Sequence, residues 1–413
     1  MSLYDKASLV MIPSGYKASS ATLYSVVPNT SGGDFDVTVD ADATRVNKDG
    51  LIESVAANQA RLDYPLTDGV VGDCPHLLLE PSRTNLVLRS EELNTTWLTF
   101  RSSVTANDIV SPDGSQNAEK IIQQSGETSS GGVYQNLTLS SSTVYTYSVF
   151  LKSGGYDFGM IRIDGGQYAW FNLSSGTVGT ITGSGSSSIQ DFGNGWYRCS
   201  FTITTTSTTG QPHIYIANSD GSQTLSGADG VKGIYAWGAM VEQGSYPTSY
   251  IPTEGSSVTR SAETTNATVP SGIFGTSGGT IYVEGVVGAP DTSGQMPFTA
   301  GTDTSNLIYI WIQTNGTLVV ESYTTTAQCG IYSSSGILSV GDSYKIAFGY
   351  ANNDFVLYLN GTQIGTDTSG SIAIPANVKL GNYITSGYTS GKIKQVMIFN
   401  TRLSNTELQT LTS

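Results

Sequence analysis

The sequence predicts an all-β protein, in which an N-terminal extended β and irregular anchoring region precedes two antiparallel β-sandwich domains of jelly-roll type. Only 13% of the 413 residues are charged, whereas Gly (48) and Tyr (23) are abundant and Ser and Thr crowd every segment. Short runs alternate apolar and polar residues with a period of two, and Gly-, Asn- and Ser-rich turns separate them. These observations favour short strands joined by tight turns over helices.

Residues 1–90 form the first region. The strand-like pieces SLVMIP, ATLYSVVP and DFDVTVD alternate with turn clusters, and TRVNKDGLIESV predicts a hairpin around Lys48, Asp49 and Gly50. So few short strands cannot close a core of their own. We therefore predict an extended arm for anchoring and oligomerisation that needs neighbours to bury its apolar residues. An independent globular domain stays as the alternative.

Residues 91–253 are predicted to form the first sandwich, from the runs VYTYSVFLK, FGMIRI, YAWFNL, WYRCSFTI, HIYIAN and GIYAWGAMVE. The stretch EQGSYPTSYIPTEG then contains Pro247 and Pro252, which cannot donate hydrogen bonds to a strand ladder. We interpret this stretch as the seam that closes the domain, so Glu242 is not expected to be a catalytic acid. The polar residues 254–265 are predicted to be a linker.

Residues 266–413 are predicted to form the second sandwich, from eight alternating runs between GTIYVEGVV and KIKQVMIFN. Asn360 and Gly361 in DFVLYLNGTQIG predict a tight hairpin turn, because both residues tolerate positive φ. Ser404 and Glu407 have the spacing of a capping box, which predicts a short C-terminal helix.

Three sets of motifs resemble known families. SLYDKASLVMIPSGYK, ATRVNKDGLIESVAANQARLDYP and CPHLLLEPSRTNL resemble the N-terminal region of tailed-bacteriophage structural proteins. PDGSQNAEKI, GNGWYRCSFTI and YAWGAMVEQGSYPTSYIPT resemble a carbohydrate-binding-module-like jelly roll. DFVLYLNGTQIG and QVMIFNTRLSNTELQTL resemble a concanavalin-like or laminin-G-like lectin sandwich.

The resemblance implies a virion surface protein of the tail-fibre or head-fibre type that attaches to host-surface or environmental glycans. Its expected partners are other virion proteins, its expected state is a homo-oligomer with a trimer favoured, and its expected location is the virion, assembled in the host cytoplasm. A purely structural capsid-decoration or tail-assembly protein is one alternative. A polysaccharide depolymerase is another.

Composition excludes several classes of partner. The net charge of −14 argues against nucleic acid. No apolar run approaches the length of a membrane span, and the N-terminus lacks the pattern of a signal peptide, so no membrane insertion is predicted. Three widely spaced cysteines, Cys74, Cys199 and Cys329, argue against a disulfide framework.

Catalytic and metal motifs are missing from the sequence, and we predict that the protein is not an enzyme. The chain has two histidines, His76 and His213, and its strand acids Glu284 and Glu321 are isolated, whereas glycoside hydrolysis requires paired carboxylates. DFDVTVDAD places four aspartates on one strand face, without the glycine turn of a calcium loop. No cofactor or metal site is predicted, and a structural Ca²⁺ is left open.

Glycan binding is the remaining chemistry, because sugars stack their CH faces on aromatic rings and need polar groups at the rim. Alternation in the runs 158–163, 168–173 and 213–218 turns one set of side chains away from the core. If these strands are neighbours, the set forms a groove; the alternative is that it packs against another subunit or domain. The predicted groove residues are Arg162, Tyr168, Trp170, Asn172, His213 and Tyr215. Further candidates are Trp311, Tyr383 and Tyr388.

Overall fold

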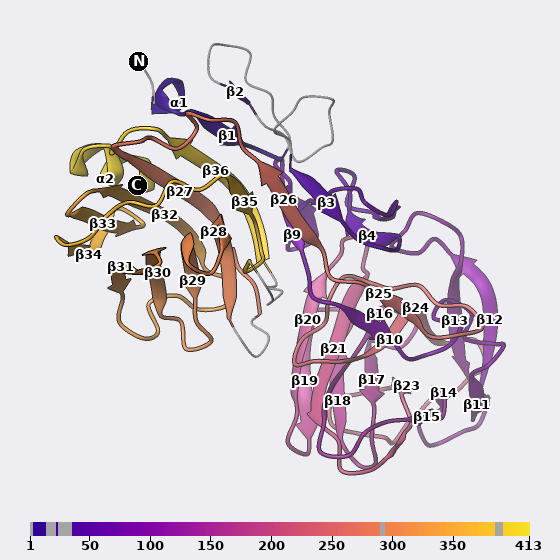
Figure 1. Cartoon of the computed structure of the whole chain (residues 1–413). Coiled ribbons are helices and arrows are strands. Elements are labelled where there is room, and N and C mark those ends of the chain that lie inside the picture. Colours follow the sequence, from indigo (N-terminus) through magenta and orange to yellow (C-terminus); the bar gives the residue numbers. More distant parts are fainter. Residues whose placement is uncertain (1–2, 14–21, 24–34, 290–293, 385–390) are drawn as a thin grey trace.

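The structure, a computed structural model, describes residues 3–13, 22–23, 35–289, 294–384 and 391–413. Over these residues the chain forms two β-sandwiches, and its helices are α1 (Leu3–Lys6) and α2 (Asn405–Thr412) (Figure 1). The predicted all-β class is confirmed. Tyr388 and Asp34 lie outside the described residues.

The C-terminal sandwich contains two facing sheets. In the described part of the chain, the first runs in the order β2-β1-β36-β27-β32-β33-β34, and β9 and β6 extend it beside β36. Its strands are β1 (Leu9–Met11), β2 (Thr22–Leu23), β6 (Leu62–Asp63), β9 (His76–Leu79), β27 (Gly278–Val287), β32 (Ser343–Ala351), β33 (Asp354–Leu359), β34 (Thr362–Asp367) and β36 (Gly391–Phe399).

The second sheet of this sandwich has the order β3-β26-β35-β28-β29-β30-β31. Apolar side chains of both sheets, such as Ile281, Phe348, Phe298 and Ile310, are fully buried in one core between them. The strands are β3 (Asp36–Thr38), β26 (Thr264–Thr268), β28 (Gln295–Asp303), β29 (Asn306–Ile312), β30 (Leu318–Thr324), β31 (Thr326–Tyr332) and β35 (Asn377–Lys379).

The middle sandwich also contains two facing sheets. One has the order β11-β14-β23-β17-β18-β19, with β11 (Leu98–Phe100), β14 (Gly132–Tyr134), β17 (Phe158–Arg162), β18 (Tyr168–Asn172), β19 (Thr177–Thr182) and β23 (His213–Ala217). The other has the order β12-β13-β24-β16-β21-β20, with β12 (Ser102–Ile109), β13 (Ala118–Gln123), β16 (Val144–Gly154), β20 (Ser186–Asp191), β21 (Tyr197–Thr204) and β24 (Gly233–Gln243).

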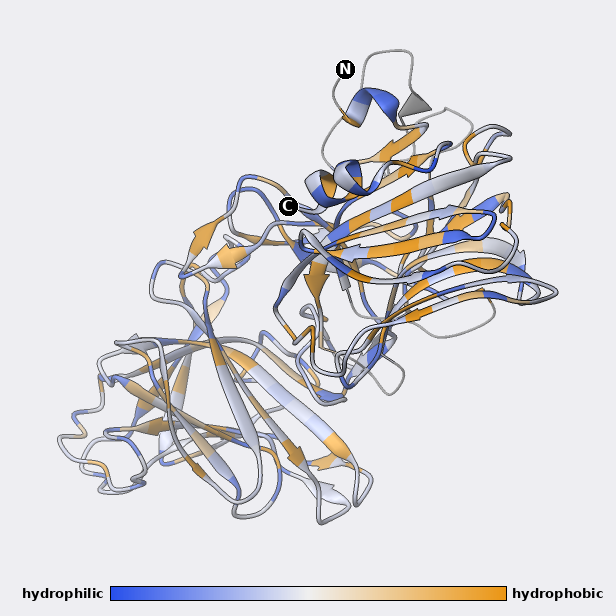
Figure 2. Cartoon of the chain, turned by 90° about the vertical axis from the view of Figure 1, so that its left-hand side faces the viewer, coloured by the Kyte–Doolittle hydropathy of each residue, from blue (hydrophilic) through white to orange (hydrophobic). Residues whose placement is uncertain are grey.

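Alternation of residue type explains both sandwiches. Figure 2 shows hydrophobic and hydrophilic residues alternating along their strands. In the middle sandwich the inward set includes Ile161, Phe171 and Ile214 from one sheet and Tyr147 and Phe201 from the other, all fully buried. Paired ribbons complete the fold: β4 (Ala43–Val46) with β5 (Ile52–Val55), β7 (Leu66–Thr67) with β8 (Val70–Val71), β10 (Arg83–Asn85) with β25 (Val258–Arg260), and β15 (Leu137–Thr138) with β22 (Thr209–Gly210).

The local signals at the C-terminal hairpin and helix are confirmed. Asn360 and Gly361 have φ of 47° and 78° and connect β33 to β34. Ser404 caps α2: its hydroxyl accepts from the Glu407 N–H, and the Glu407 carboxylate accepts from the Ser404 N–H.

The N-terminal region is not a free arm. β1 and β9 both pair with β36, and β3 pairs with β26, so strands from the first 80 residues extend both sheets of the C-terminal sandwich. Leu9, Phe35 and Leu77 are fully buried in its core. The neighbours that this region needs are therefore supplied by the same chain, and its composition no longer argues for oligomerisation.

The predicted linker, residues 254–265, is corrected as well. It contains β25, which pairs with β10 over Val258–Arg260. Arg260 and Glu263 are only 1% and 2% exposed. A flexible linker would leave both charges in water, so this segment is an integral part of the fold.

Arg260 and Glu263 belong to a buried ionic cluster with Arg61 and Glu80. Arg61 contacts both carboxylates, and Arg260 Nη1 lies 2.9 Å from Glu80 Oε2. The Glu80 N–H donates to Glu263 over 2.8 Å, and the Ser249 N–H donates to Glu80 over 2.8 Å. Burial alone would raise the pKa of Glu80, but Arg260 and Arg61 outweigh it and hold that pKa well below its ordinary value.

The seam behaves as the sequence predicts. Tyr250 and Ile251 are buried against Trp237 in the middle sandwich. The Glu242 carboxylate is fully buried and accepts hydrogen bonds from the backbone N–H and the hydroxyl of Thr248, at 2.9 and 2.8 Å. This glutamate therefore closes the seam.

We predict that Arg61→Ala lowers the free energy of unfolding by about 3–5 kcal/mol, because it leaves Glu80 and Glu263 buried with too little positive charge. Lys232→Ala, which breaks the exposed pair with Asp229, should leave the free energy of unfolding nearly unchanged. Chemical denaturation of the variants measures both values. Equal, small losses would show that the buried cluster does not hold the fold together.

Candidate functional site

The strands predicted to share a face are neighbours. β17 lies between β23 and β18, with Arg162 opposite His213 on one side and Tyr168 on the other, and Tyr134 of β14 lies opposite His213. These four side chains form a row across four strands, on the face away from the core. The next row contains Phe100, Tyr215, Met160 and Trp170, with Gly132 between Phe100 and Tyr215.

Aromatic rings stack along this face. The rings of Tyr134 and His213 are parallel within 9° with centroids 4.7 Å apart, and those of His213 and Tyr215 are parallel within 7° at 4.9 Å. Phe100 meets His213 and Tyr215 edge-on at 5.6 and 5.1 Å. Because Gly132 carries no side chain, Phe100 can reach Tyr215 across it.

Arg162 occupies the middle of the row. Its Nη2 donates to the Gln211 side-chain oxygen over 3.0 Å and lies 3.1 Å from His213 Nε2, and its Nη1 donates to the Tyr168 hydroxyl over 3.4 Å. The guanidinium lies 5.7 Å from the Tyr168 ring centroid, within the range of a cation–π contact. Among the described residues, no carboxylate forms an ion pair with Arg162, and its Nε has no hydrogen-bond partner.

His213 is held as a neutral ring. Its Nδ1 donates to the Gln211 carbonyl oxygen over 2.7 Å, which leaves Nε2 free to accept from Arg162. Burial lowers the pKa of His213 to about 4, aided by the charge of Arg162 and opposed by the bond to Gln211. At 6% and 7% exposure, His213 and Tyr215 are not the open stacking platforms that the sequence predicts: the His213 ring lies between Tyr134 and Tyr215, supports the stack and adds no charge at neutral pH.

Tyr134, His213, Tyr215 and Arg162 border an open groove of about 580 Å³, whereas Tyr168, which was also predicted for this groove, lies outside its lining. Its wall is made of polar and aromatic side chains from β14, β17 and β23 and from the loops beside them, together with Phe100 of β11. The lining residues are Phe100, Arg101, Ser129, Ser130, Tyr134, Arg162, Gln211, His213, Tyr215, Gln223 and Thr224.

Two predicted groove residues have other roles. Trp170 is 2% exposed, because its indole packs beside Tyr168 and Nε1 donates to the Ser222 carbonyl of the covering loop over 3.3 Å. The prediction that it is an exposed stacking platform is corrected. The Asn172 side-chain oxygen accepts from the backbone of Ser174 and Ser175 at 3.0 and 3.1 Å, so it stabilises the turn after β18.

Sequence reasoning missed Phe100, Arg101, Tyr134, Gln211 and Gln223. β11 and β14 are only three residues long, too short for a period-two signal. A signal did exist in GGVYQN, where apolar Val133 next to Tyr134 indicates one inward and one outward side chain.

A second aromatic surface lies on the outer face of the C-terminal sandwich, over β29, β30 and β31. The Glu321 carboxylate accepts hydrogen bonds from the hydroxyls of Tyr309, Tyr323 and Tyr332. The Tyr383 ring meets Tyr309 edge-on at 5.8 Å. Burial would raise the pKa of Glu321, but the tyrosine hydroxyls outweigh it and lower that pKa. We call this set the Glu321 surface.

Trp311 shares the outward face of β29 with Tyr309, two residues away, and is partly buried. The third member predicted for this domain, Tyr388, lies outside the described residues. Of the candidates predicted in this domain, Trp311 and Tyr383 both lie beside Tyr309, and the tyrosines around Glu321 extend this aromatic surface.

The isolated acids do not form a catalytic pair. Glu284 lies on β27 and accepts from the Tyr282 hydroxyl over 3.0 Å, whereas Glu321 lies on β30 in the opposite sheet. Both face away from the core, so the full sandwich separates them. Asp36, Asp40 and Asp42 are exposed, and within the described ranges no three His, Cys, Asp or Glu side chains are grouped to hold a metal ion.

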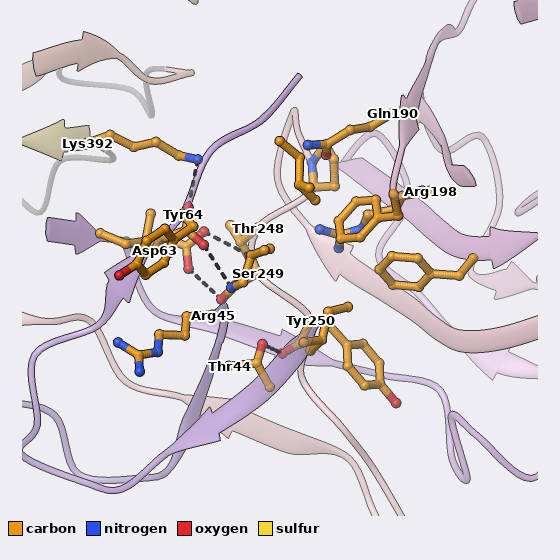
Figure 3. A pocket seen from close by; sticks show the side chains of 18 residues that line it. Thr44, Arg45, Asp63, Tyr64, Gln190, Arg198, Thr248, Ser249, Tyr250 and Lys392 are labelled. Atoms are coloured by element: carbon orange, nitrogen blue, oxygen red, sulfur yellow. Dashed lines mark hydrogen bonds and ion pairs between the residues drawn. The ribbon is translucent and has the colours of Figure 1, made fainter. Parts of the chain in front are cut away.

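A smaller cavity of about 160 Å³ lies where the N-terminal region meets the middle sandwich and the seam (Figure 3). Lys392 Nζ lies 2.8 Å from the Asp63 carboxylate, and the Thr44 hydroxyl donates to the Tyr250 carbonyl over 2.5 Å. Ser249 donates from its N–H and its hydroxyl to Glu80. Since these polar groups satisfy one another, we interpret the cavity as a packing junction.

We predict that NMR titration of the two histidine rings gives midpoints near pH 4 for both, since burial lowers the pKa of His76 and His213 to about 4. The unfolded chain takes up these protons near pH 6.5. Each histidine therefore makes the free energy of unfolding fall as the pH drops from about 6.5 to 4. Arg162→Gln should raise the His213 midpoint and leave that of His76 unchanged; a His213 midpoint at 6.5 in the unmodified protein contradicts the arrangement.

Comparison with known protein families gives a match for one part of the chain. Residues 261–409 match the family model described as the concanavalin A-like lectin/glucanases superfamily. No curated protein matches the chain. Among the described residues, no helix is both long and apolar enough to cross a membrane.

Solved structures give partial matches, which extend over about a third of the chain. The CBM40 of the IT-sialidase from Ruminococcus gnavus, bound to alpha2,3 sialyllactose, is 19% identical over 34% of this chain and 84% of its own, with a TM-score of 0.30. The NanB sialidase from Streptococcus pneumoniae is 15% identical over 34% and 25%, with a TM-score of 0.30. A heptameric SAP-like pentraxin from Limulus polyphemus is 17% identical over 33% and 70%, with a TM-score of 0.28. Residues 261–409, about a third of the chain, are thus similar to concanavalin A-like lectin/glucanase domains.

Proposed function

We propose that this chain is a carbohydrate-binding protein that holds a glycan in the groove of its middle sandwich. The observation that carries the proposal is the row of Tyr134, His213, Arg162 and Tyr168 across four neighbouring strands, turned away from the core. Tyr134, the partly exposed end of the stack with His213 and Tyr215, offers an aromatic ring to the CH groups of a sugar. Arg162, Gln211 and Gln223 bring hydrogen-bonding groups to sugar hydroxyls.

The lectin-like domain supports the same function independently. Residues 261–409 match a superfamily of lectins and glucanases, and the Glu321 surface exposes aromatic rings beside a carboxylate on that domain. Separation of Glu284 and Glu321 by the sandwich favours binding over hydrolysis by this pair, because glycosidases need two carboxylates within about 10 Å.

We also propose that the protein is a fibre-type component of a tailed-bacteriophage virion and forms a homotrimer. The support is the resemblance of motifs within residues 1–90 to the N-terminal region of tailed-bacteriophage structural proteins. Antibodies against the chain should label purified particles, and sedimentation equilibrium should give three times the 43.5 kDa of the chain. Unlabelled particles from a producing culture, or a monomer, contradict these proposals.

We predict that Tyr134→Ala weakens binding to the preferred glycan about tenfold, because the outer ring of the stack is removed while the buried core stays intact. The matched control is Tyr235→Ala, which removes a partly exposed tyrosine from the outer face of the opposite sheet. A glycan array identifies the ligand, and calorimetry measures both variants. Equal affinities for the two variants, with both folded, place the site elsewhere.

A further inference from the structure

We infer that the groove selects glycans that carry a negatively charged group, a carboxylate or a sulfate, and that Arg162 is the residue that binds it. The inference rests on the proposed function and specifies its substrate class. It follows from the charges in and around the groove.

The first step is the charge of the lining. It contains two arginines, Arg101 and Arg162, and no aspartate or glutamate, although the whole chain carries a net charge of −14. Arg101 reaches Glu127 at 3.5 Å, but both side chains are substantially exposed and such a pair is weak. The groove is therefore a positive site on an acidic protein.

The second step concerns the other titratable groups that face Arg162. From β23 it meets His213 and Tyr215, and from β18 it meets Tyr168. His213 is neutral above about pH 4, and burial raises the pKa of Tyr215 to about 12. At neutral pH none of these side chains compensates the guanidinium charge.

The third step is the unfinished hydrogen bonding of Arg162. Within the described chain its acceptors are the neutral side chains of Gln211, His213 and Tyr168, and its Nε has no acceptor. Arg61 and Arg260 differ in that each contacts a glutamate, although their Nε atoms likewise have no acceptor. A planar anionic group matches the fork of a guanidinium and forms charge-assisted bonds about twice as strong as neutral ones.

The orientation of Arg162 suits this role. Gln211 holds both Arg162 and His213 in place, because its side-chain oxygen accepts from Arg162 and its backbone carbonyl oxygen accepts from His213 Nδ1. The guanidinium is thus positioned beside the stacked rings before a ligand arrives, which reduces the entropy lost on binding. A sugar ring lying on Tyr134 would present a substituent to Arg162.

The test compares charged oligosaccharides with matched neutral ones by calorimetry. The probes are oligogalacturonate and its carboxyl-reduced form, and a sulfated galactan oligomer and its desulfated form. We expect at least one charged probe to bind about tenfold more tightly than its neutral partner, and salt to weaken that binding. The pair of probes that shows the preference identifies the anionic group as a carboxylate or a sulfate.

Variants assign the preference to Arg162. Arg162→Gln should abolish it, and Arg162→Lys should keep part of it. Lys120→Gln, which removes a cation that lies over the Tyr235 ring on the other sheet, should leave it intact. If Arg162→Gln fails to fold, Arg101→Gln gives a second measurement, since Arg101 is exposed and the preference should fall with its charge.

The outcomes separate this inference from the proposed function. The groove binds sugar without selecting charge, and the inference is overturned, in either of two cases. Neutral probes bind as tightly as charged ones, or the array finds only neutral glycans whose binding is weakened by Tyr134→Ala. If no glycan on the array binds, both the inference and the proposed function are overturned.

Discussion

The fold depends on the buried cluster of Arg61, Glu80, Arg260 and Glu263, because a charge that loses its partner in the interior is very costly. Its members come from the N-terminal region and from the segment between the two sandwiches, and Ser249 of the seam bonds to it. The cluster therefore fastens three stretches of chain at the junction of the sandwiches. Because the middle sandwich ends at that seam, the same contacts fix the domain that carries the groove.

Much of the groove could be predicted from the sequence, because a strand turns alternate side chains to opposite faces. Placing Ile161 and Ile214 in the core automatically placed Arg162 and His213 on the outer face, and the pairing of β17 with β23 brings them together. Trp170 shows where alternation stops being sufficient. It lies on the outer face as predicted, but the loop containing Ser222 covers it, and no local pattern reveals which loop folds over a strand.

The cluster itself could not be predicted, for a related reason. Arg61 and Glu263 are about two hundred residues apart in the sequence, and each lies in a polar segment that resembles exposed chain. Charged residues are usually solvated, so composition favours a linker for 254–265, and the few short strands of the first region favour an arm that needs neighbours without indicating which ones. Long-range pairing overrides that expectation: once β3 pairs with β26 and β10 with β25, the charges are drawn inside together. Local signals that need no distant partner, such as the capping box of Ser404, were predictable in full.

The two aromatic surfaces carry opposite charge, and this constrains how the protein can use them. The groove presents Arg162 without an acidic partner, whereas the Glu321 surface presents a carboxylate that has no ion-pair partner among the described residues. An anionic sugar attracted to the first would be repelled by the second, so the two surfaces cannot be equivalent sites for one charged unit. If both bind, they must contact different groups of a polymer or different molecules. Because one chain carries both surfaces, a ligand bound at the groove has a raised effective concentration at the Glu321 surface. This applies only to a ligand that offers a group suited to each surface, so two weak contacts together become selective for such a ligand.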